Sequence, residues 1–361
     1  MIATEGVSTI TRNARYVAAL GLAMASTVDL AVTPAGSAAE PLYRIAAQWP
    51  VGGTTGWDCL TFDAVRSRLF VTRADHIDVV DTRSGQISAT IAGTAGVHAV
   101  ALAPELHRGY ASNGKANSVT VFDLDTLQVL REVPVSGVNP DEIVYVPGTQ
   151  QILTMNGRSN NATVLDANTL ASVATIALPG KPEFAVEDRH GNLFVNIETE
   201  PGELIRIDSK TLKITATWML TGCNSPSGIA LDARHSRLFS SCDDKVLAVT
   251  DATNGRAVAR ISIGDHPDGA AFDSTRQLIF SSNGDGSLSI VHEDGPNHYS
   301  ALAPLLTQRG ARTLAFDAAT RRIYSITADF GPTSAPTAAQ PRPRPAILPG
   351  TARVLVMEAV R

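Results

Sequence analysis

Residues 58–63 read DCLTFD, and a segment of this kind recurs six more times along the 361-residue chain. Each copy starts with a charged or polar residue and continues through a mostly apolar run that usually ends in Asp. The copies start at Asp58, His98, Asp141, Glu183, Ser227, Asp268 and Arg312, so that successive starts lie 40, 43, 42, 44, 41 and 44 residues apart. This period is typical of a four-stranded β-propeller blade.

Three further strand-like segments complete each repeat. A second strand such as 192–196 (NLFVN) is followed by a third such as 118–123 (SVTVFD) and an alternating fourth such as 129–135 (VLREVPV). The last repeat has its third strand at 352–359, and residues 42–51 offer the missing fourth. We therefore predict an all-β, seven-bladed β-propeller whose last blade is closed by the N-terminal strand, because closure protects the sheet edges. A pair of β-sandwiches would not explain seven nearly equal periods.

The first 39 residues have the three parts of a secretory signal peptide. Arg12 and Arg15 precede a mostly apolar stretch, 16–26 (YVAALGLAMAS), and small residues at 36–39 (GSAA) precede Glu40. We predict cleavage before Glu40, which leaves one propeller domain at 40–361 and implies a periplasmic or secreted protein in an oxidising compartment. The alternatives are an uncleaved anchor and a disordered tail.

The second and third strands carry a family resemblance. Segments such as 70–73 (FVTR) and 110–113 (YASN), each followed by a V-x-V-x-D type of strand, resemble the YVTN-repeat propellers, the YncE-like family, over residues 42–360. The resemblance implies an exported propeller and weakly implies binding, since most members have no established activity. A related group of propellers includes lactonases.

The start of each first strand is where we expect a site. In a propeller the first strand of every blade lines the central channel, so the seven repeat-starting residues should surround one channel mouth. Second strands end at the same mouth, and the rim adds two more side chains, Trp57 and His266. The predicted ligand-binding residues are Asp58, His98, Asp141, Glu183, Ser227, Asp268, Arg312, Trp57, Asn113, Asn156, Asn196 and Asn283, with Arg73 as a further neighbour.

The chemistry of this ring leaves three interpretations open. Converging carboxylates repel one another, and burial would raise their pKa values, so a cation or Arg312 would have to offset the charge. Hard oxygen ligands suit Ca²⁺ or Mg²⁺, for which the candidates are Asp58, Asp141, Glu183 and Asp268. His98 is the candidate general base or ligand. The alternatives to a metal site are a binding site for another small molecule and a water-filled channel of salt-bridged side chains.

Other histidines and cysteines have simpler expectations. His107, His190 and His235 fall in first-to-second strand turns, at the opposite end of the channel, where we expect solvated surface residues. Cys223 precedes a first strand and Cys242 ends the neighbouring second strand, so an exported chain should join them in a disulfide. The alternative is two buried thiols. Cys59 follows Asp58 within a strand and is expected to be a small core residue.

The largest departure from the repeat length is a Pro-rich insertion at 330–350 in the last blade. It links the second and third strands there, so it should emerge at the channel mouth, and its prolines favour extended polyproline II. It could act as a semi-rigid lid or as a ligand for a partner domain, with Arg342 and Arg344 reaching the acidic ring. The alternative is a solvent-exposed loop.

Composition excludes several classes of function. The net charge is −5 and no long basic run is present, so no nucleic-acid partner is expected, and no membrane span remains after removal of the signal. No HExxH, CxxCH, GxSxG or P-loop motif is present. The favoured hypothesis is a scaffold or binding protein for an unknown periplasmic protein or small molecule. The alternatives are a metal-assisted hydrolase of lactonase type and, by analogy of fold alone, a redox accessory protein.

Overall fold

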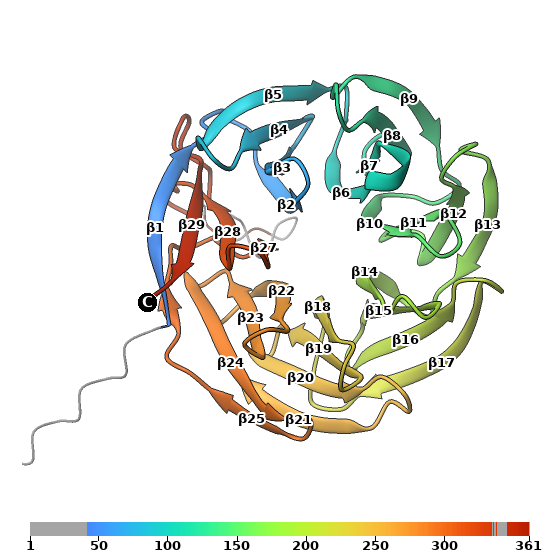
Figure 1. Cartoon of the computed structure of the whole chain (residues 1–361), viewed down its shortest axis with the longest axis vertical. Helices are drawn as coiled ribbons and strands as arrows, with labels where there is room; N and C mark the ends of the chain where they lie inside the picture. Colours follow the sequence, from blue (N-terminus) through green and yellow to red (C-terminus); the bar gives the residue numbers. More distant parts are fainter. Residues whose placement is uncertain (1–41, 334, 336, 338–344, 361) are drawn as a thin grey trace, which may run out of the picture. The chain divides into compact units, whose positions relative to one another are not determined.

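Seven antiparallel sheets surround a central axis in the computed structural model, which describes residues 42–333, 335, 337 and 345–360 (Figure 1). The predicted seven-bladed β-propeller is confirmed. Within the described residues the only helix is a short 3₁₀ turn, η1 (Pro104–Leu106), in the first turn of blade 2. The predicted signal peptide, residues 1–39, lies outside the described residues.

Each blade contributes four strands from the channel outward. The inner strands are β2 (Trp57–Asp63), β6 (Val97–Ala103), β10 (Pro140–Val146), β14 (Lys181–Glu187), β18 (Pro226–Asp232), β22 (Pro267–Asp273) and β27 (Leu314–Asp317). The second strands are β3 (Arg68–Arg73), β7 (Arg108–Asn113), β11 (Gln151–Asn156), β15 (Asn192–Glu198), β19 (Arg237–Cys242), β23 (Leu278–Asn283) and β28 (Arg322–Thr327). The third strands are β4 (His76–Asp81), β8 (Ser118–Asp123), β12 (Asn161–Asp166), β16 (Gly202–Asp208), β20 (Val246–Asp251), β24 (Ser287–Gly295) and β29 (Arg353–Ala359). The outer strands are β5 (Gln86–Ala92), β9 (Val129–Pro134), β13 (Ser172–Ala177), β17 (Lys213–Leu220), β21 (Ala257–Ser262), β25 (His298–Ala301) and β1 (Tyr43–Pro50), and a two-residue strand, β26 (Leu305–Leu306), pairs with β24.

The N-terminal strand closes the ring as predicted. β1 lies antiparallel to β29, so the outer strand of blade 7 comes from the opposite end of the chain (Figure 1). Tyr43 of β1 is fully buried, and its ring meets that of Phe280 in blade 6 edge-on at 5.2 Å. Arg276 of blade 6 donates a hydrogen bond to the Tyr43 hydroxyl. Blades 6 and 7 are therefore joined through the closing strand.

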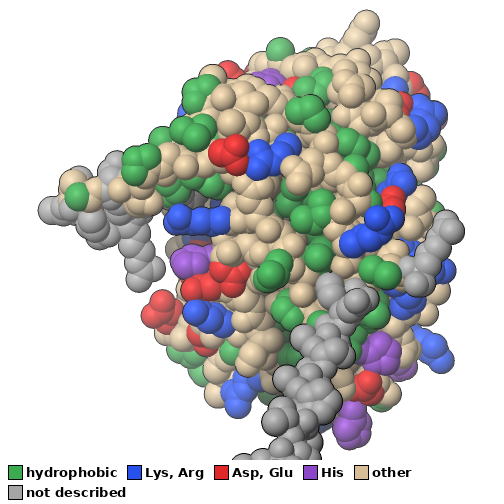
Figure 2. All heavy atoms as spheres, turned by 90° about the vertical axis from the view of Figure 1, so that its left-hand side faces the viewer, with side chains coloured by type: hydrophobic (Ala, Val, Ile, Leu, Met, Phe, Trp, Pro, Cys, Tyr) green, Lys and Arg blue, Asp and Glu red, His purple; other side chains and the backbone are tan. Residues whose placement is uncertain are grey.

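The hydrophobic core lies between neighbouring blades. Leu69 and Val80 of blade 1, for example, pack with Tyr324 and Val354 of blade 7. These side chains come from second and third strands, whose apolar runs face neighbours on both sides. The outer strand β1 alternates instead, and the side of the molecule on which it lies shows hydrophobic, acidic and basic side chains interspersed (Figure 2).

The predicted disulfide is confirmed. Cys223, in the segment before β18, is bonded to Cys242 at the end of β19, and both residues are fully buried. The bond ties the chain that enters blade 5 to that blade's second strand. Cys59 is a free, partly buried thiol of β2, and burial raises its pKa well above that of an ordinary thiol, an effect that Asp58 reinforces.

Removing this disulfide should destabilise the fold without changing it. A closed loop with a sequence separation of 19 residues stabilises the folded state by about 3 kcal/mol in the chain-entropy model. We expect Cys223→Ala/Cys242→Ala to lower the free energy of unfolding by about that amount, measured by urea denaturation. Cys59→Ala is the control for loss of a cysteine outside the bond. An unchanged denaturation midpoint in the double variant would contradict the assignment.

Candidate functional site at the channel mouth

The structure brings all seven repeat-starting side chains to one cavity. Its volume is about 370 Å³, and it opens at the end of the channel where the inner strands begin. His266, predicted on the rim, also lines it. The lining residues are Asp58, His98, Asp141, Lys181, Glu183, Glu198, Ser225, Ser227, Asp243, His266, Pro267, Asp268 and Arg312.

A β-bulge places the ring residue in six of the seven blades. In blade 1, Trp57 pairs with Arg73 and Leu60 with Val71, so that Asp58 and Cys59 together face one residue of β3. The same register shift falls at the ring residues of blades 2 to 6. A bulge bends the strand and redirects the side chain at that point, so it turns the ring residue toward the axis.

Buried hydroxyl groups hold the backbone of the ring. Thr72 Oγ1 of blade 1 donates to the carbonyl of His98 in blade 2 at 2.8 Å. Ser112 Oγ of blade 2 donates to the carbonyl of Asp141 in blade 3 at 2.5 Å. Ser282 Oγ of blade 6 donates to the carbonyl of Arg312 in blade 7. Each hydroxyl comes from a second strand and fixes the ring residue of the next blade, a role that the sequence analysis missed although Thr or Ser recurs at this position.

The second-strand amides lie elsewhere than predicted. Asn113, Asn156, Asn196 and Asn283 have no exposed surface and do not line the cavity. Asn113 Nδ2, for example, donates to Ser118 Oγ and Thr120 Oγ1 of its own blade, whereas Asn196 Nδ2 donates to the carbonyls of Ser227 and Gly228 in the next blade. These amides satisfy buried polar groups within and between blades, so they are structural residues.

Two other residues predicted to lie at the mouth, Arg73 and Trp57, do not line the cavity either. Arg73 is buried, pairs with Asp78 at 3.2 Å and donates to the carbonyls of Gly52 and Thr55. Trp57 packs against Phe330, with ring centroids 6.3 Å apart. Neither side chain lines the cavity, because both hold loops at its edge.

A histidine between two carboxylates forms one side of the cavity. His98 Nδ1 lies 2.5 Å from Asp58 Oδ2 and 3.3 Å from Asp141 Oδ1. Burial opposes the charged imidazole, but the two carboxylates outweigh burial and raise the pKa of His98. Burial also raises the pKa of the Asp141 carboxyl, although His98 works against it. The imidazole therefore stands between two carboxylates in one polar cluster.

In blade 4, next to Asp141 of blade 3, Lys181 is the residue that sequence reasoning missed. Its Nζ bonds to Glu183 and to Glu198, and these carboxylates raise the pKa of Lys181 although burial lowers it. Burial raises the pKa of Glu183, with Lys181 opposing the shift. Because Lys181 and Glu183 lie two residues apart in β14, strand periodicity places them on one face. That spacing was the available signal.

Hydrogen bonds and ion pairs complete the ring. Arg312 Nε lies 3.3 Å from Asp268 Oδ2, and Ser227 Oγ donates to Asp268 Oδ1 at 3.0 Å. The lining holds six carboxylates and two permanent cations, Lys181 and Arg312, besides two histidines. The cavity is therefore acidic overall, and it attracts positive charge.

The structure groups potential metal ligands differently from the prediction. Ligand atoms of Asp58, His98 and Asp141 lie within 4.8 Å of one another, whereas Glu183 is paired with Lys181 and Asp268 with Arg312. The four predicted carboxylates do meet at a smaller cavity of about 30 Å³, beside Cys59, Glu142 and Phe184, which is large enough for water. A nitrogen ligand favours a transition-metal ion over Ca²⁺ or Mg²⁺ in the Asp58–His98–Asp141 cluster.

The base of the Pro-rich insertion is fixed beside the mouth. Phe330 and Ile347 form an isolated antiparallel bridge, and the Gly350 N–H donates to the Gly53 carbonyl at 2.8 Å. Arg342 and Arg344 lie outside the described residues, so the lid remains a prediction.

Comparisons with known proteins identify the fold. No protein-family model and no curated protein matches the sequence. A chain of the Mitotic Checkpoint Complex matches with a TM-score of 0.70 at 12% identity, covering 94% of this chain and 100% of that one. The WD40 repeats of RRP9 match at 0.69 and 11%, covering 88% and 97%. A chain of Kuenenia stuttgartiensis Hydrazine Synthase matches at 0.66 and 15%, covering 76% and 92%. At these identities the likeness is one of fold, and the YncE-like resemblance is not confirmed.

Two observations bear on where the protein is located. The disulfide is compatible with a secreted protein. In the part of the chain that the structure describes, no helix has the length and apolar character needed to cross a bilayer.

The His98 cluster should make stability depend on pH. Because folding raises the pKa of His98, its stabilising effect is complete below the ordinary histidine pKa and disappears as pH rises through the folded value. We expect the free energy of unfolding of the wild type to fall relative to that of His98→Gln across this window. Urea denaturation from about pH 5.5 to 9, with a chelator present, measures the difference. A difference independent of pH would contradict the assignment.

Proposed function

We propose that the protein is an exported binding protein whose channel mouth takes a small polar ligand that carries a positive charge. The acidic cavity supports this most directly: side chains from all seven blades meet in about 370 Å³ with an excess of carboxylates. The volume suits a small molecule rather than a folded partner. Export is supported by the Cys223–Cys242 disulfide, since such bonds persist in oxidising compartments.

The ring is built as a fixed recognition surface. The buried hydroxyls of Thr72, Ser112 and Ser282 hold the backbone of ring residues in the next blade, so the ligand-facing side chains stand on an ordered frame. A preorganised site loses less conformational entropy on binding. Lys181 and Arg312 lie among the carboxylates and would orient a ligand with both a cationic and an acidic group.

Binding of a cationic probe should depend on Asp141. We expect 1,4-diaminobutane, the lead member of a panel of small amines, to bind the wild type, and Asp141→Asn to weaken binding about tenfold or more because one facing charge is removed. Isothermal titration calorimetry measures both. Asp294→Asn is the matched control, since Asp294 is an exposed carboxylate in the outer hairpin of blade 6. Equal affinity of Asp141→Asn and the wild type, or no binding of any amine, would overturn the proposal.

A metal-assisted hydrolase of lactonase type is the second candidate. One observation favours it: ligand atoms of Asp58, His98 and Asp141 converge within 4.8 Å. An ion held there would polarise an ester carbonyl or lower the pKa of a bound water. Glu183, whose pKa burial raises, lies in the same cavity and could protonate a leaving group.

Metal content tests this candidate. We expect the wild type, purified without chelator, to carry at this site a divalent ion that mass spectrometry detects and that Asp141→Asn loses. Lactone hydrolysis should then require the ion and fall by about 100-fold or more in the variant. Asp294→Asn should keep both ion and activity. Equal metal content in Asp141→Asn and the wild type would exclude an ion ligated by Asp141.

A further inference from the structure

At the end of the channel opposite the mouth, a hydrogen-bonded turn recurs between the first and second strands of several blades. In blades 1, 5, 6 and 7 an Asp ends the inner strand and accepts the backbone N–H groups two and three residues later. We call the residue three positions after this Asp the latch residue. Arg66, the latch residue of blade 1, bonds to Asp63 and reaches Asp125 of blade 2 at 2.6 Å. Arg276, that of blade 6, bonds to Asp273 and to Tyr43 of blade 7.

In blade 5 the latch residue is His235, and the residue that it meets is also exceptional. In blades 1 to 6 the residue immediately before the second strand accepts, through its carbonyl, an N–H from the end of the third strand, and in blade 5 this acceptor is Ser236, next to His235. The donors at this equivalent position are Thr82, Leu124, Ala167, Ser209, Ala252 and Glu293. Glu293 is the one ionisable side chain among these six, and it lies in blade 6, opposite His235.

His235 and Glu293 meet Asp232 in a buried cluster. His235 Nδ1 lies 2.7 Å from Asp232 Oδ2 and 3.3 Å from Glu293 Oε1. The Glu293 side chain has no exposed surface, and that of Asp232 is 4% exposed. His235 is thus not the solvated surface residue expected from its place in a turn.

The polar atoms of this cluster are not satisfied by one another. His235 Nδ1 and Glu293 Oε2 are buried and have no hydrogen-bond partner among the described residues. A close nitrogen–oxygen approach without hydrogen-bond geometry means that no N–H points along it. A buried carboxylate oxygen without a hydrogen-bond donor costs stability, and a metal cation that accepts its lone pair would remove that cost.

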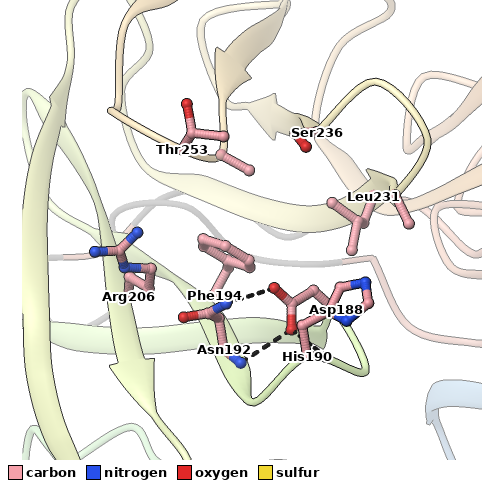
Figure 3. A pocket seen from close by; sticks show the side chains of 10 residues that line it. Asp188, His190, Asn192, Phe194, Arg206, Leu231, Ser236 and Thr253 are labelled. Atoms are coloured by element: carbon pink, nitrogen blue, oxygen red, sulfur yellow. Dashed lines mark hydrogen bonds between the residues drawn. The ribbon is translucent and has the colours of Figure 1, made fainter.

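The neighbouring junction shows that the fold does not require this cluster. His190 occupies the equivalent position in blade 4, and the residue opposite it in blade 5 is Ala252. The two line a pocket of about 200 Å³, shown in Figure 3, in which Asp188 accepts hydrogen bonds from Asn192. No carboxylate of blade 5 is among the residues that line it. Of these two junctions with a histidine at this position, the one between blades 5 and 6 has a glutamate opposite the histidine and the one between blades 4 and 5 has an alanine.

We propose that Asp232, His235 and Glu293 bind a divalent transition-metal ion between blades 5 and 6, and Zn²⁺ is the ion considered below. Ligand atoms of all three residues lie within 4.8 Å of one another. Tetrahedral ligands about 2.1 Å from Zn²⁺ stand about 3.4 Å apart, so modest adjustment accommodates an ion. One imidazole and two carboxylates leave a fourth position for water. The Tyr299 hydroxyl, 3.3 Å from Glu293 Oε1, would orient that carboxylate.

Zn²⁺ binding by the full chain tests this site. We expect chelator-treated wild type to bind Zn²⁺ in calorimetric titration, with an increase in Tm, because the ion joins two blades of the folded state. His235→Arg supplies the latch residue that blades 1 and 6 already use, so it should keep the fold and lose about one equivalent of Zn²⁺. Glu293→Gln, nearly isosteric, should weaken binding about 100-fold.

Two controls make the outcome specific. His190→Arg changes the equivalent histidine of blade 4 and should bind Zn²⁺ as the wild type does. Asp141→Asn removes only ions at the channel mouth, so a loss there leaves this site intact and separates the two proposals. The proposal is overturned if chelator-treated wild type takes up no Zn²⁺, or if His235→Arg and Glu293→Gln both bind as many equivalents as the wild type with unchanged affinity.

Discussion

Closure of the ring by β1 is the constraint on which the rest of the structure depends. Each blade buries its apolar faces only against two neighbours, so the seventh must be complete before the sixth and first are covered. The β1–β29 pairing supplies that strand, and Tyr43 carries the contact across to Phe280. Once the circle is closed, seven inner strands point along one axis, and the residues that begin them can only meet at one mouth.

Support of the fold and presentation of the site fall to different side chains. The carbonyl groups of the ring residues are held by hydroxyls such as Thr72 and Ser112, which recur from blade to blade. The ring side chains themselves are free to differ, and they include carboxylates, an imidazole, a hydroxyl and a guanidinium. A position whose backbone is fixed by a neighbour can vary its side chain at little cost to stability, and this is how a repeat protein builds a single asymmetric site.

Periodicity was enough to predict what depends on the repeat. The blade count, the closing strand, the ring and the Cys223–Cys242 pair all follow from regular spacing. What failed depends on side-chain direction. Asn113 ends a strand that reaches the mouth, yet its amide turns into the blade to satisfy buried hydroxyls, and that of Asn196 turns to carbonyls of the next blade. Lys181 lay outside the repeat signature, and Glu293 gave no local sign that it would face His235 across a junction.

Departures from a repeat are informative because the repeat states what the fold requires at each position. Blades 1 to 5 place Thr, Leu, Ala or Ser at the buried position after the third strand, and blade 6 places Glu293 there. The glutamate contributes nothing to ring closure, and its burial costs it the hydration of its carboxylate. Lys181 amid Glu183 and Glu198 is a second departure, in which the added charge has its partners inside the chain. Glu293 differs because one of its oxygens has none among the described residues. Burial without a partner costs stability, so selection for folding alone would favour a small residue there, and the glutamate is best understood through what it can bind.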